Sequence, residues 1–402
     1  MMNVMKYTDI LQQINTPCYV INDKKLTENW LDIYNNFNNC WNGNVILGYS
    51  VKTNHFPYML KWAKDRDMMA EVVSADEYHY ALENGFEAEN IIFNGPQKAE
   101  DVLLLAIKEN SIINLDNLDE LDILEAHRKE LSDSCRIGIR VNFNLEEICK
   151  NETTAGSDVS RLGICVENGD FEAAVKRLHA LHLKVNGLHM HYSTKSRSIN
   201  VFEALAEKAC KLSEQYNLVD EIIYIDIGGG FFGGRILAGK PTMEEYSDII
   251  TTTLKTVFSP DKVKLILEPG ASLIATAIDY YCKVRNVREI RGCRVITVDG
   301  STLHINPFMQ TRVPEYEIFS SHEMVIGEQV VCGSTCMEMD RFFTLKDGNE
   351  LGKDDLIMIK NAGAYTLSFN NCFINTPPAV YIDQAGEVIE LRNLKEVSMS
   401  LV

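Results

Sequence analysis

The sequence lacks any apolar run that approaches the roughly 18 uninterrupted residues of a membrane-spanning helix. It also lacks basic character, since 39 Lys and Arg residues stand against 57 Asp and Glu residues, a net charge of −18 at pH 7. This charge repels nucleic acids and anionic membranes, so neither is expected as a partner. The first residues contain no apolar segment followed by a cleavage pattern, so no signal peptide is predicted.

Cysteine pairing patterns are missing as well. The eleven cysteines are an odd number and lack the spacing of a small disulfide-bonded domain, which favours a reducing cytoplasm. The closest two, Cys332 and Cys336, form a C-x3-C spacing with no second pair nearby. A zinc site is therefore not predicted.

The sequence does contain a long alternation of β-rich and amphipathic stretches. Eight apolar, strand-like ranges are residues 45–52, 70–74, 91–95, 111–116, 136–142, 185–193, 222–230 and 264–268. Helical patterns include residues 24–37, 76–84, 98–109, 170–181, 201–216 and 243–257. Alternation of this kind predicts parallel strands in an α/β fold, and eight units are the number that closes a (β/α)8 barrel. The polar loop Asn151–Asp158 is a candidate substrate lid.

The character of the sequence changes after the eighth strand. Short β-like runs follow at residues 280–287, 293–299, 324–332, 356–359 and 380–382. These runs predict a second, mostly β domain. We expect residues 1–28 to supply a strand to that domain, residues 29–275 to form the barrel and residues 276–402 to form the rest of the β domain.

Catalytic groups of a (β/α)8 barrel lie at the carboxyl ends of its strands. Those positions hold Lys52, Glu71, Ser74, Asn94, Arg140, His191, Gly228–Gly230 and Glu268. One amine, one imidazole, a guanidinium, carboxylates and a glycine run suit a phosphorylated aromatic cofactor that is bound to the amine. In a dry pocket the pKa of Lys52 falls and the amine can form a Schiff base. The alternative is a solvated lysine in an ordinary loop.

The glycine run has more than one interpretation. Gly228, Gly229 and Gly230 can turn backbone N–H groups toward a phosphate. With Gly233 they also satisfy the dinucleotide pattern G-x-G-x-x-G of a Rossmann dehydrogenase. That pattern is disfavoured here because no clear helix begins at Gly233 and the segment lies in the seventh strand unit. An ordinary glycine turn is a further alternative.

Two other strand ends also leave alternatives. Buried Glu268 needs a cationic partner, which is either a protonated pyridine nitrogen or a neighbouring Lys or Arg. His191 could stack on a cofactor ring or be a simple packed residue. His189 and His191 face the same side of their strand, but no third ligand is evident, so no metal is predicted.

Ordered blocks over nearly the whole chain resemble the pyridoxal-phosphate-dependent decarboxylases of the alanine-racemase-like barrel fold, the diaminopimelate and ornithine decarboxylases. The blocks are Tyr49–Asn54, Glu71–Ser74, Arg136–Asn142, Ser160–Ile164, Gly187–Thr194, Gly228–Gly230, Glu268–Gly270, Cys332–Asp340 and Gly363–Tyr365. The resemblance implies a barrel that binds pyridoxal 5′-phosphate, followed by a β domain.

The resemblance also implies roles for individual residues. Lys52 is the Schiff-base lysine, His191 stacks on the ring, Glu268 holds the ring nitrogen, and Cys336 is the proton donor. Other cofactor contacts would be Glu71, Ser74, Arg140, Thr194, Gly228, Gly229, Gly230, Gly270 and Tyr365. In the relatives the cysteine block comes from the partner subunit, which implies a homodimer with shared active sites.

Two positions depart from the family pattern. The arginine of E-P-G-R is Ala271 here, and the acidic residue that follows the catalytic cysteine is Met337. A methionine cannot pair with a buried ammonium group. Arg312 falls near a family block and is a candidate for holding a distal carboxylate, while Asp340 closes the cysteine block beside the substrate.

These features predict a PLP-dependent α-decarboxylase of an amino acid. The substrate would be a modified amino acid with a neutral or carboxylated side-chain end, as in secondary metabolism or siderophore synthesis. The alternatives are an amino-acid racemase on the same fold and a non-catalytic PLP-binding protein. The second is weakened because those relatives are single barrels without a β domain.

Overall fold

The computed structural model describes residues 13–154, 159–306, 308, 310–369 and 373–393. It divides the chain into two compact units, Trp30–Ser272 and a unit formed by Met1–Asn29 with Leu273–Val402. Half of the predicted lid, residues 155–158, falls outside the described ranges. None of the helices in these ranges has the length and apolar character that crossing a membrane requires.

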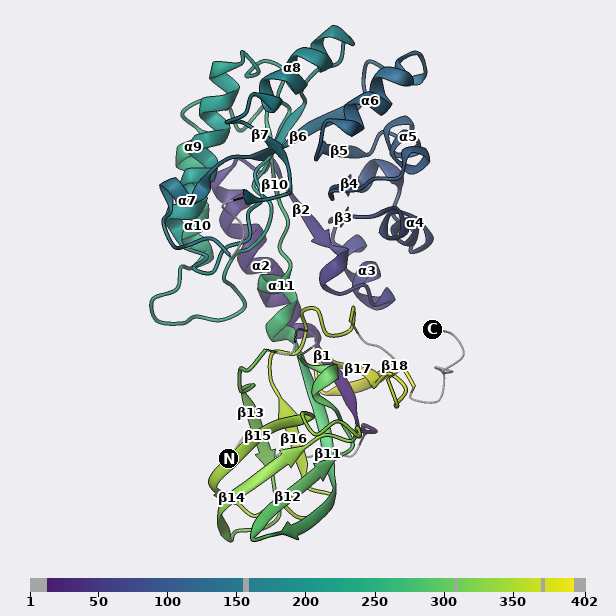
Figure 1. The fold of residues 1–402 in the computed structure, drawn as a ribbon, viewed down its shortest axis with the longest axis vertical. Coiled ribbons are helices and arrows are strands. Elements are labelled where there is room, and N and C mark those ends of the chain that lie inside the picture. Colours follow the sequence, from purple (N-terminus) through teal and green to yellow (C-terminus); the bar gives the residue numbers. More distant parts are fainter. Residues whose placement is uncertain (1–12, 155–158, 307, 309, 370–372, 394–402) are drawn as a thin grey trace. The chain divides into compact units, whose positions relative to one another are not determined.

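The unit Trp30–Ser272 is a closed barrel of eight parallel strands, as predicted (Figure 1). The strands are β2 (Val45–Ser50), β3 (Met69–Val72), β4 (Ile91–Phe93), β5 (Ile112–Leu115), β6 (Arg136–Asn142), β8 (Gly187–His189), β9 (Tyr224–Asp226) and β10 (Lys264–Leu267). Pairing of β10 with β2 and of β5 with β6 closes the ring. The short strand β7 (Ile164–Cys165) extends from β6.

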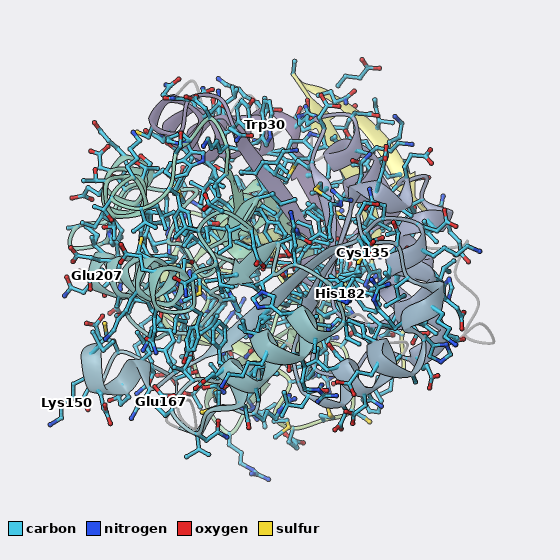
Figure 2. All side chains as sticks on the ribbon, turned by 90° about the horizontal axis from the view of Figure 1, so that it is seen from above. Trp30, Cys135, Lys150, Glu167, His182 and Glu207 are labelled. Atoms are coloured by element: carbon cyan, nitrogen blue, oxygen red, sulfur yellow. The ribbon has the colours of Figure 1, made fainter. Side chains whose placement is uncertain are left out.

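Helices alternate with these strands along the chain. They are α2 (Asp23–Cys40), α3 (Pro57–Lys64), α4 (Ala75–Glu83), α5 (Glu100–Lys108), α6 (Asp119–Ala126), α7 (Leu145–Ile148), α8 (Asp170–Ala180), α9 (Ile199–Gln215), α10 (Met243–Leu254) and α11 (Ala271–Ile274). The six predicted helices are all present, and the glycine run is separated from α10 by a loop, so it does not open a Rossmann helix. Viewed from above, exposed charges such as Lys150, Glu167 and Glu207 project at the rim (Figure 2).

Inward-facing side chains form the core of the barrel. Met69, Ile92, Ile112, Tyr224 and Ile266 pack together from five strands. Tyr224 needs the space left by two glycines, because a Cβ at position 187 would lie 2.2 Å from its ring and one at position 138 would lie 2.2 Å from its hydroxyl. A tyrosine hydroxyl therefore reaches into the barrel interior.

The other unit is mostly β-sheet. Its strands are β1 (Cys18–Asn22), β11 (Ile278–Ile290), β12 (Cys293–Val298), β13 (Tyr316–Phe319), β14 (Val325–Cys332), β15 (Arg341–Asn349), β16 (Leu356–Ile359), β17 (Ala379–Gln384) and β18 (Glu387–Arg392). The main order is β15-β14-β12-β11-β1-β17-β18, and β16 joins β11 to β13. The first strand β1 pairs antiparallel with β11 and parallel with β17. The sequence did not predict β13, β15 or β18.

Candidate active site

Lys52 lies directly after β2, in a single helical turn formed by Val51–Thr53. Its amine forms an ion pair with Glu71, which lies on the neighbouring strand β3. Burial lowers the pKa of the Lys52 amine, but the carboxylates of Glu71 and Glu268 outweigh burial and raise the pKa above its ordinary value. The pocket therefore does not lower the pKa of this lysine as a dry pocket without nearby charges would, because carboxylates lie close to the amine.

A chain of hydrogen bonds through the barrel interior holds these carboxylates in place. The Asn94 amide donates to Glu71 Oε1 at 3.1 Å and to Glu268 Oε1 at 2.5 Å. Asn114 in turn donates to Asn94 Oδ1 at 2.8 Å, and the Tyr224 hydroxyl donates to Asn114 Oδ1 at 2.9 Å. All five side chains are buried. Sequence reasoning found Asn94 as a strand end but missed Asn114 and Tyr224.

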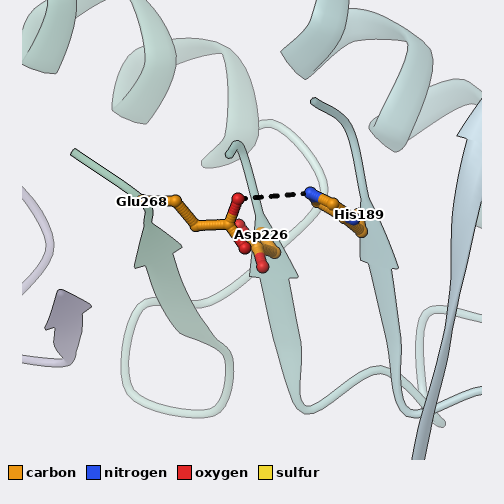
Figure 3. A group of neighbouring side chains, drawn as sticks. All are labelled: His189, Asp226 and Glu268. Carbon is orange, nitrogen blue, oxygen red and sulfur yellow. Dashed lines mark ion pairs between the residues drawn. The ribbon is translucent and has the colours of Figure 1, made fainter. Parts of the chain in front are cut away.

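Three buried groups from neighbouring strands form the next part of the site (Figure 3). Ligand atoms of His189, Asp226 and Glu268 lie within 4.8 Å of one another, and His189 Nε2 is 3.4 Å from Glu268 Oε2. Burial and the charge of Glu268 raise the pKa of Asp226, whereas His189 overcomes burial and lowers the pKa of Glu268. The proton therefore stays on Asp226 and the charge on Glu268.

This group changes the prediction about metal ligands. Sequence reasoning considered the pair His189 and His191, but the group of described residues that could hold a cation is His189 with Asp226 and Glu268. The ligand set that a cation could use therefore excludes His191. Because Asp226 keeps its proton and Glu268 is ionised, the two carboxyl groups can lie close together without a cation. Asp226 could have been identified from the sequence because it lies two residues after Tyr224, and residues two apart in a strand face the same side.

His191, two residues after the end of β8, presents a flat, uncharged ring. Burial, reinforced by the charge of Arg140, lowers the pKa of His191 to about 3, so the imidazole is neutral. Its Nδ1 accepts a hydrogen bond from the Gly229 N–H at 3.0 Å, and its ring stacks at 6.1 Å from that of His189. Arg140 forms an ion pair of 3.3 Å with Asp116.

The glycine segment approaches the strands beside it closely. Gly228 has a φ of +71°, and a Cβ there would lie 2.5 Å from the Cβ of His191. The N–H of Gly228 donates to Asp226 Oδ1 at 2.8 Å, and that of Gly229 donates to His191. Two of the three N–H groups expected to face a phosphate are thus used inside the protein. Only Gly230 N–H, of these three, has no partner in the described part of the chain.

The remaining predicted barrel residues have local bonds of their own. The Ser74 hydroxyl caps α4 by accepting a hydrogen bond from the Glu77 N–H at 3.2 Å. The Thr194 hydroxyl accepts a hydrogen bond from the Arg197 N–H at 3.3 Å. Gly270 approaches Thr53, where a Cβ would lie 2.7 Å from the Thr53 hydroxyl. Ala271 is half-buried at the first position of α11.

The other predicted residues lie in the β unit. Cys336 is exposed, and Met337 beside it is half-buried, in the turn between β14 and β15. Tyr365 has a left-handed φ of +62°, and Arg312 is exposed.

Asp340 has a role that the sequence did not indicate. Its buried carboxylate accepts hydrogen bonds from the amides and hydroxyls of Thr302 and Thr335, at 2.7 to 3.1 Å. These bonds overcome burial and lower the pKa of Asp340. The carboxylate thus points into the turn that carries Cys336 and braces it.

The barrel side chains fit a phosphorylated pyridine aldehyde. The residues there supply an amine, a neutral flat ring, an ionised carboxylate and the backbone N–H of Gly230, a glycine with positive φ. Several buried polar atoms also have no hydrogen-bond partner among the described residues, as a site for a polar ligand requires. They are Thr53 Oγ1, Arg140 Nε, His189 Nδ1, Asp226 Oδ2 and Ser272 Oγ.

Similarity to known proteins agrees with this chemistry. A family model described as "Pyridoxal-dependent decarboxylase, pyridoxal binding domain" matches residues 25–275. Diaminopimelate decarboxylase of Campylobacter jejuni is 27% identical over 91% of this chain and 90% of its own length, and that of Bacillus subtilis is 27% identical over 85% and 80%.

Solved structures share the fold. Diaminopimelate decarboxylase from Methanocaldococcus jannaschii superposes with a TM-score of 0.83 at 23% identity, covering 97% of this chain and 94% of that one. Arginine decarboxylase of Paramecium bursaria Chlorella virus gives 0.76 at 21% identity, covering 95% and 100%. Because the family model spans more than half of the sequence, the chain belongs to the pyridoxal-dependent decarboxylases, enzymes that use pyridoxal 5′-phosphate to remove a carboxyl group from an amino acid.

Proposed function

We propose that Lys52 holds pyridoxal 5′-phosphate covalently and that the chain removes the α-carboxyl group of a modified amino acid. The observation that carries this is the ion pair of Lys52 with Glu71 inside a ring of buried carboxyl groups at the strand ends. Glu71 Oε2 is the nearest base, so it can take the proton that the amine must lose before it reacts. When bound, the cofactor supplies an electron sink for the pair left on the α-carbon.

The other barrel residues bind and orient. The ionised carboxylate of Glu268 would accept a hydrogen bond from a protonated ring nitrogen, which suits its lowered pKa. The neutral ring of His191, fixed by Gly229, offers a flat face for stacking. Gly230, Thr194 and Tyr365 would contact the phosphate, with Ser74, Arg140 and Gly270 supporting the site.

We assign proton return to the α-carbon to Cys336, as general acid. In this proposal the thiol comes from the partner subunit of a homodimer. Cys336 is exposed on a braced turn, which suits contact with a second chain. Exposed apolar side chains of the same unit would be covered in such a dimer. They are Phe308, Met339, Phe369, Phe373 and Ile374.

The proposed substrate differs at its far end from a diamino acid. Met337 offers no charge to an ammonium group, and the side chain of Glu338 is 98% exposed and paired with Arg341 instead. Exposed Arg312 is a candidate for a distal carboxylate. We therefore propose a substrate whose side chain ends in a neutral or carboxylated group. We also propose that the enzyme works in the cytoplasm. The proposed barrel domain is residues 29–275, with the β domain made by 1–28 and 276–402.

The first test compares Lys52→Ala with Lys61→Ala, an exposed lysine on α3 that pairs with Asp65. After loading with pyridoxal 5′-phosphate and borohydride reduction, we expect a fixed cofactor in the wild type and in the Lys61 variant only. Carbon dioxide release is then measured on meso-diaminopimelate, ornithine, lysine and amino acids with acidic side-chain ends. Full turnover by Lys52→Ala would refute the mechanism, and turnover of diamino acids alone would refute the substrate class.

A second test addresses the shared site. Inactive Lys52→Ala and Cys336→Ala proteins are mixed under conditions that exchange subunits. In a dimer with shared sites, random exchange restores activity to about a quarter of the sites. Absence of recovery after proven exchange would show that each chain completes its own site.

A further inference from the structure

Two segments of the barrel unit approach each other beside the proposed phosphate position. One is the connection Thr194–Ser198, between β8 and α9, whose Thr194 hydroxyl accepts the Arg197 N–H at 3.3 Å. The other is Gly228–Phe232, after β9, which contains the Gly230 N–H. Neither segment is helix or strand, so regular backbone pairing does not fix their separation.

One side chain from a third element bonds to both segments. Tyr246 lies in the first turn of α10, is 0% exposed, and its hydroxyl donates to the Arg197 carbonyl. The same oxygen accepts a hydrogen bond from the Phe232 N–H at 3.2 Å. A single hydroxyl therefore joins the residue three after Thr194 to the residue two after Gly230.

The position of this hydroxyl is itself well determined. A capping box formed by Thr242 and Glu245 fixes the start of α10. The Tyr246 ring packs edge-on against Phe202 at 4.9 Å and Phe231 at 5.2 Å, and those two rings stack at 4.5 Å. Phe231 directly follows Gly230, so the aromatic cluster and the hydroxyl hold the same piece of backbone.

We infer that Tyr246 is a positioning residue that sets the spacing between the two halves of the phosphate site. This rests on the proposed function, in which Thr194 and Gly230 receive the phosphate of pyridoxal 5′-phosphate. The fold uses the N–H groups of Gly228 and Gly229 internally, so few donors remain and their spacing matters. A second bridge joins the first segment to the loop that follows the second one, since the Lys240 amine donates to the Ser196 carbonyl at 3.2 Å.

The test uses Tyr246→Phe, which keeps the ring cluster and removes the bridging oxygen. Tyr78→Phe is the matched control, because the Tyr78 hydroxyl bonds Ser111 at 3.1 Å just before β5, at the amino end of the strands. Dissociation constants are measured by absorbance for two probes, pyridoxal 5′-phosphate and pyridoxal, which lacks the phosphate. We expect Tyr246→Phe to bind pyridoxal 5′-phosphate about tenfold more weakly, the loss for one bridging hydrogen bond at the upper end of its range. Binding of pyridoxal should change by less than about twofold.

Each outcome separates the inference from the proposal beneath it. Failure of the wild type to bind pyridoxal 5′-phosphate more tightly than pyridoxal would overturn the phosphate site itself. With that preference present, equal weakening of both probes, or of neither, in Tyr246→Phe would overturn the positioning role. If Tyr246→Phe does not yield folded protein, Lys240→Met tests the second bridge by the same comparison, with the same overturning results.

Discussion

Replacing Asn94 by Ala should destabilise the barrel strongly, although Asn94 lies outside the ring of groups that contact Lys52 directly. Asn94 is 2% exposed and donates to two buried carboxylates, Glu71 and Glu268. A hydrogen bond to a charged group contributes about 1.5–3 kcal/mol. Loss of both bonds should therefore lower the free energy of unfolding by about 3–6 kcal/mol, with an added penalty for the unpaired amide of Asn114.

Tryptophan fluorescence measures this effect in the correct unit. The three tryptophans of the sequence, Trp30, Trp41 and Trp62, all lie in the barrel unit. Urea unfolding followed by their emission therefore reports on the barrel alone. The control is Asn36→Ala, which removes an exposed bond within α2 and should change stability by less than about 0.5 kcal/mol.

The variant Asn94→Asp tests the electrostatic part of the reasoning. A third carboxylate beside Glu71 and Glu268 should make this variant less stable than Asn94→Ala at pH 7. The difference should shrink toward pH 4, as protonation relieves the repulsion between the carboxylates. Equal stability of Asn94→Ala and wild type, or a pH-independent difference between the two variants, would refute the network.

Three further predictions concern single residues. Gly187→Ala should destabilise the barrel by about 2 kcal/mol or more in the same unfolding assay, because its Cβ would lie 2.2 Å from the Tyr224 ring. Gly327→Ala in the β unit, where an added Cβ meets nothing within 4 Å, should be nearly neutral when unfolding of that unit is followed by near-ultraviolet circular dichroism. Burial lowers the pKa of His304 from 6.5 to about 4, so the free energy of unfolding of the β unit should decrease as the pH falls from 6.5 to 4. Unfolding followed by near-ultraviolet circular dichroism measures this dependence. A His304→Asn variant whose stability changes with pH as steeply as that of the wild type would contradict the prediction. Asp340→Ala removes the acceptor of four hydrogen bonds and should lower the free energy of unfolding of the β unit by about 3–5 kcal/mol. A decrease below about 1 kcal/mol would show that this carboxylate does not hold the turn.

The barrel was predictable because each of its strands is a short apolar run between polar segments. Seven of the eight predicted ranges contain a strand of the closed sheet, and the range 70–74 overlaps β3, which begins one residue earlier. The β unit was harder. In β15 only three of nine residues are buried, and β18 has no buried residue, so neither shows the apolar alternation by which a strand is recognised.

The site was predictable where a charged residue ends an apolar run, as with Lys52 and Glu268. It was not predictable where the chemistry depends on register between distant strands. Tyr224 sits within an apolar segment and looks like core from the sequence, yet its hydroxyl serves Asn114 because glycines on two other strands leave it room. In the sequence Tyr246 likewise looks like a residue on the apolar face of a helix, because the two segments that its hydroxyl contacts are distant along the chain.

The balance of charge in the barrel explains why position 226 holds an aspartic acid that stays protonated. The ammonium of Lys52 and the carboxylate of Glu71 offset each other through their ion pair. Burial and Glu268 keep the proton on Asp226, while His189 and Lys52 overcome burial and keep Glu268 ionised. A second buried anion beside Glu268 would be unfavourable, and an apolar residue would leave the Gly228 N–H without its acceptor. A protonated aspartic acid avoids both costs, so the negative charge of the inner site rests on Glu268, the residue that we propose to pair with the ring nitrogen of the cofactor.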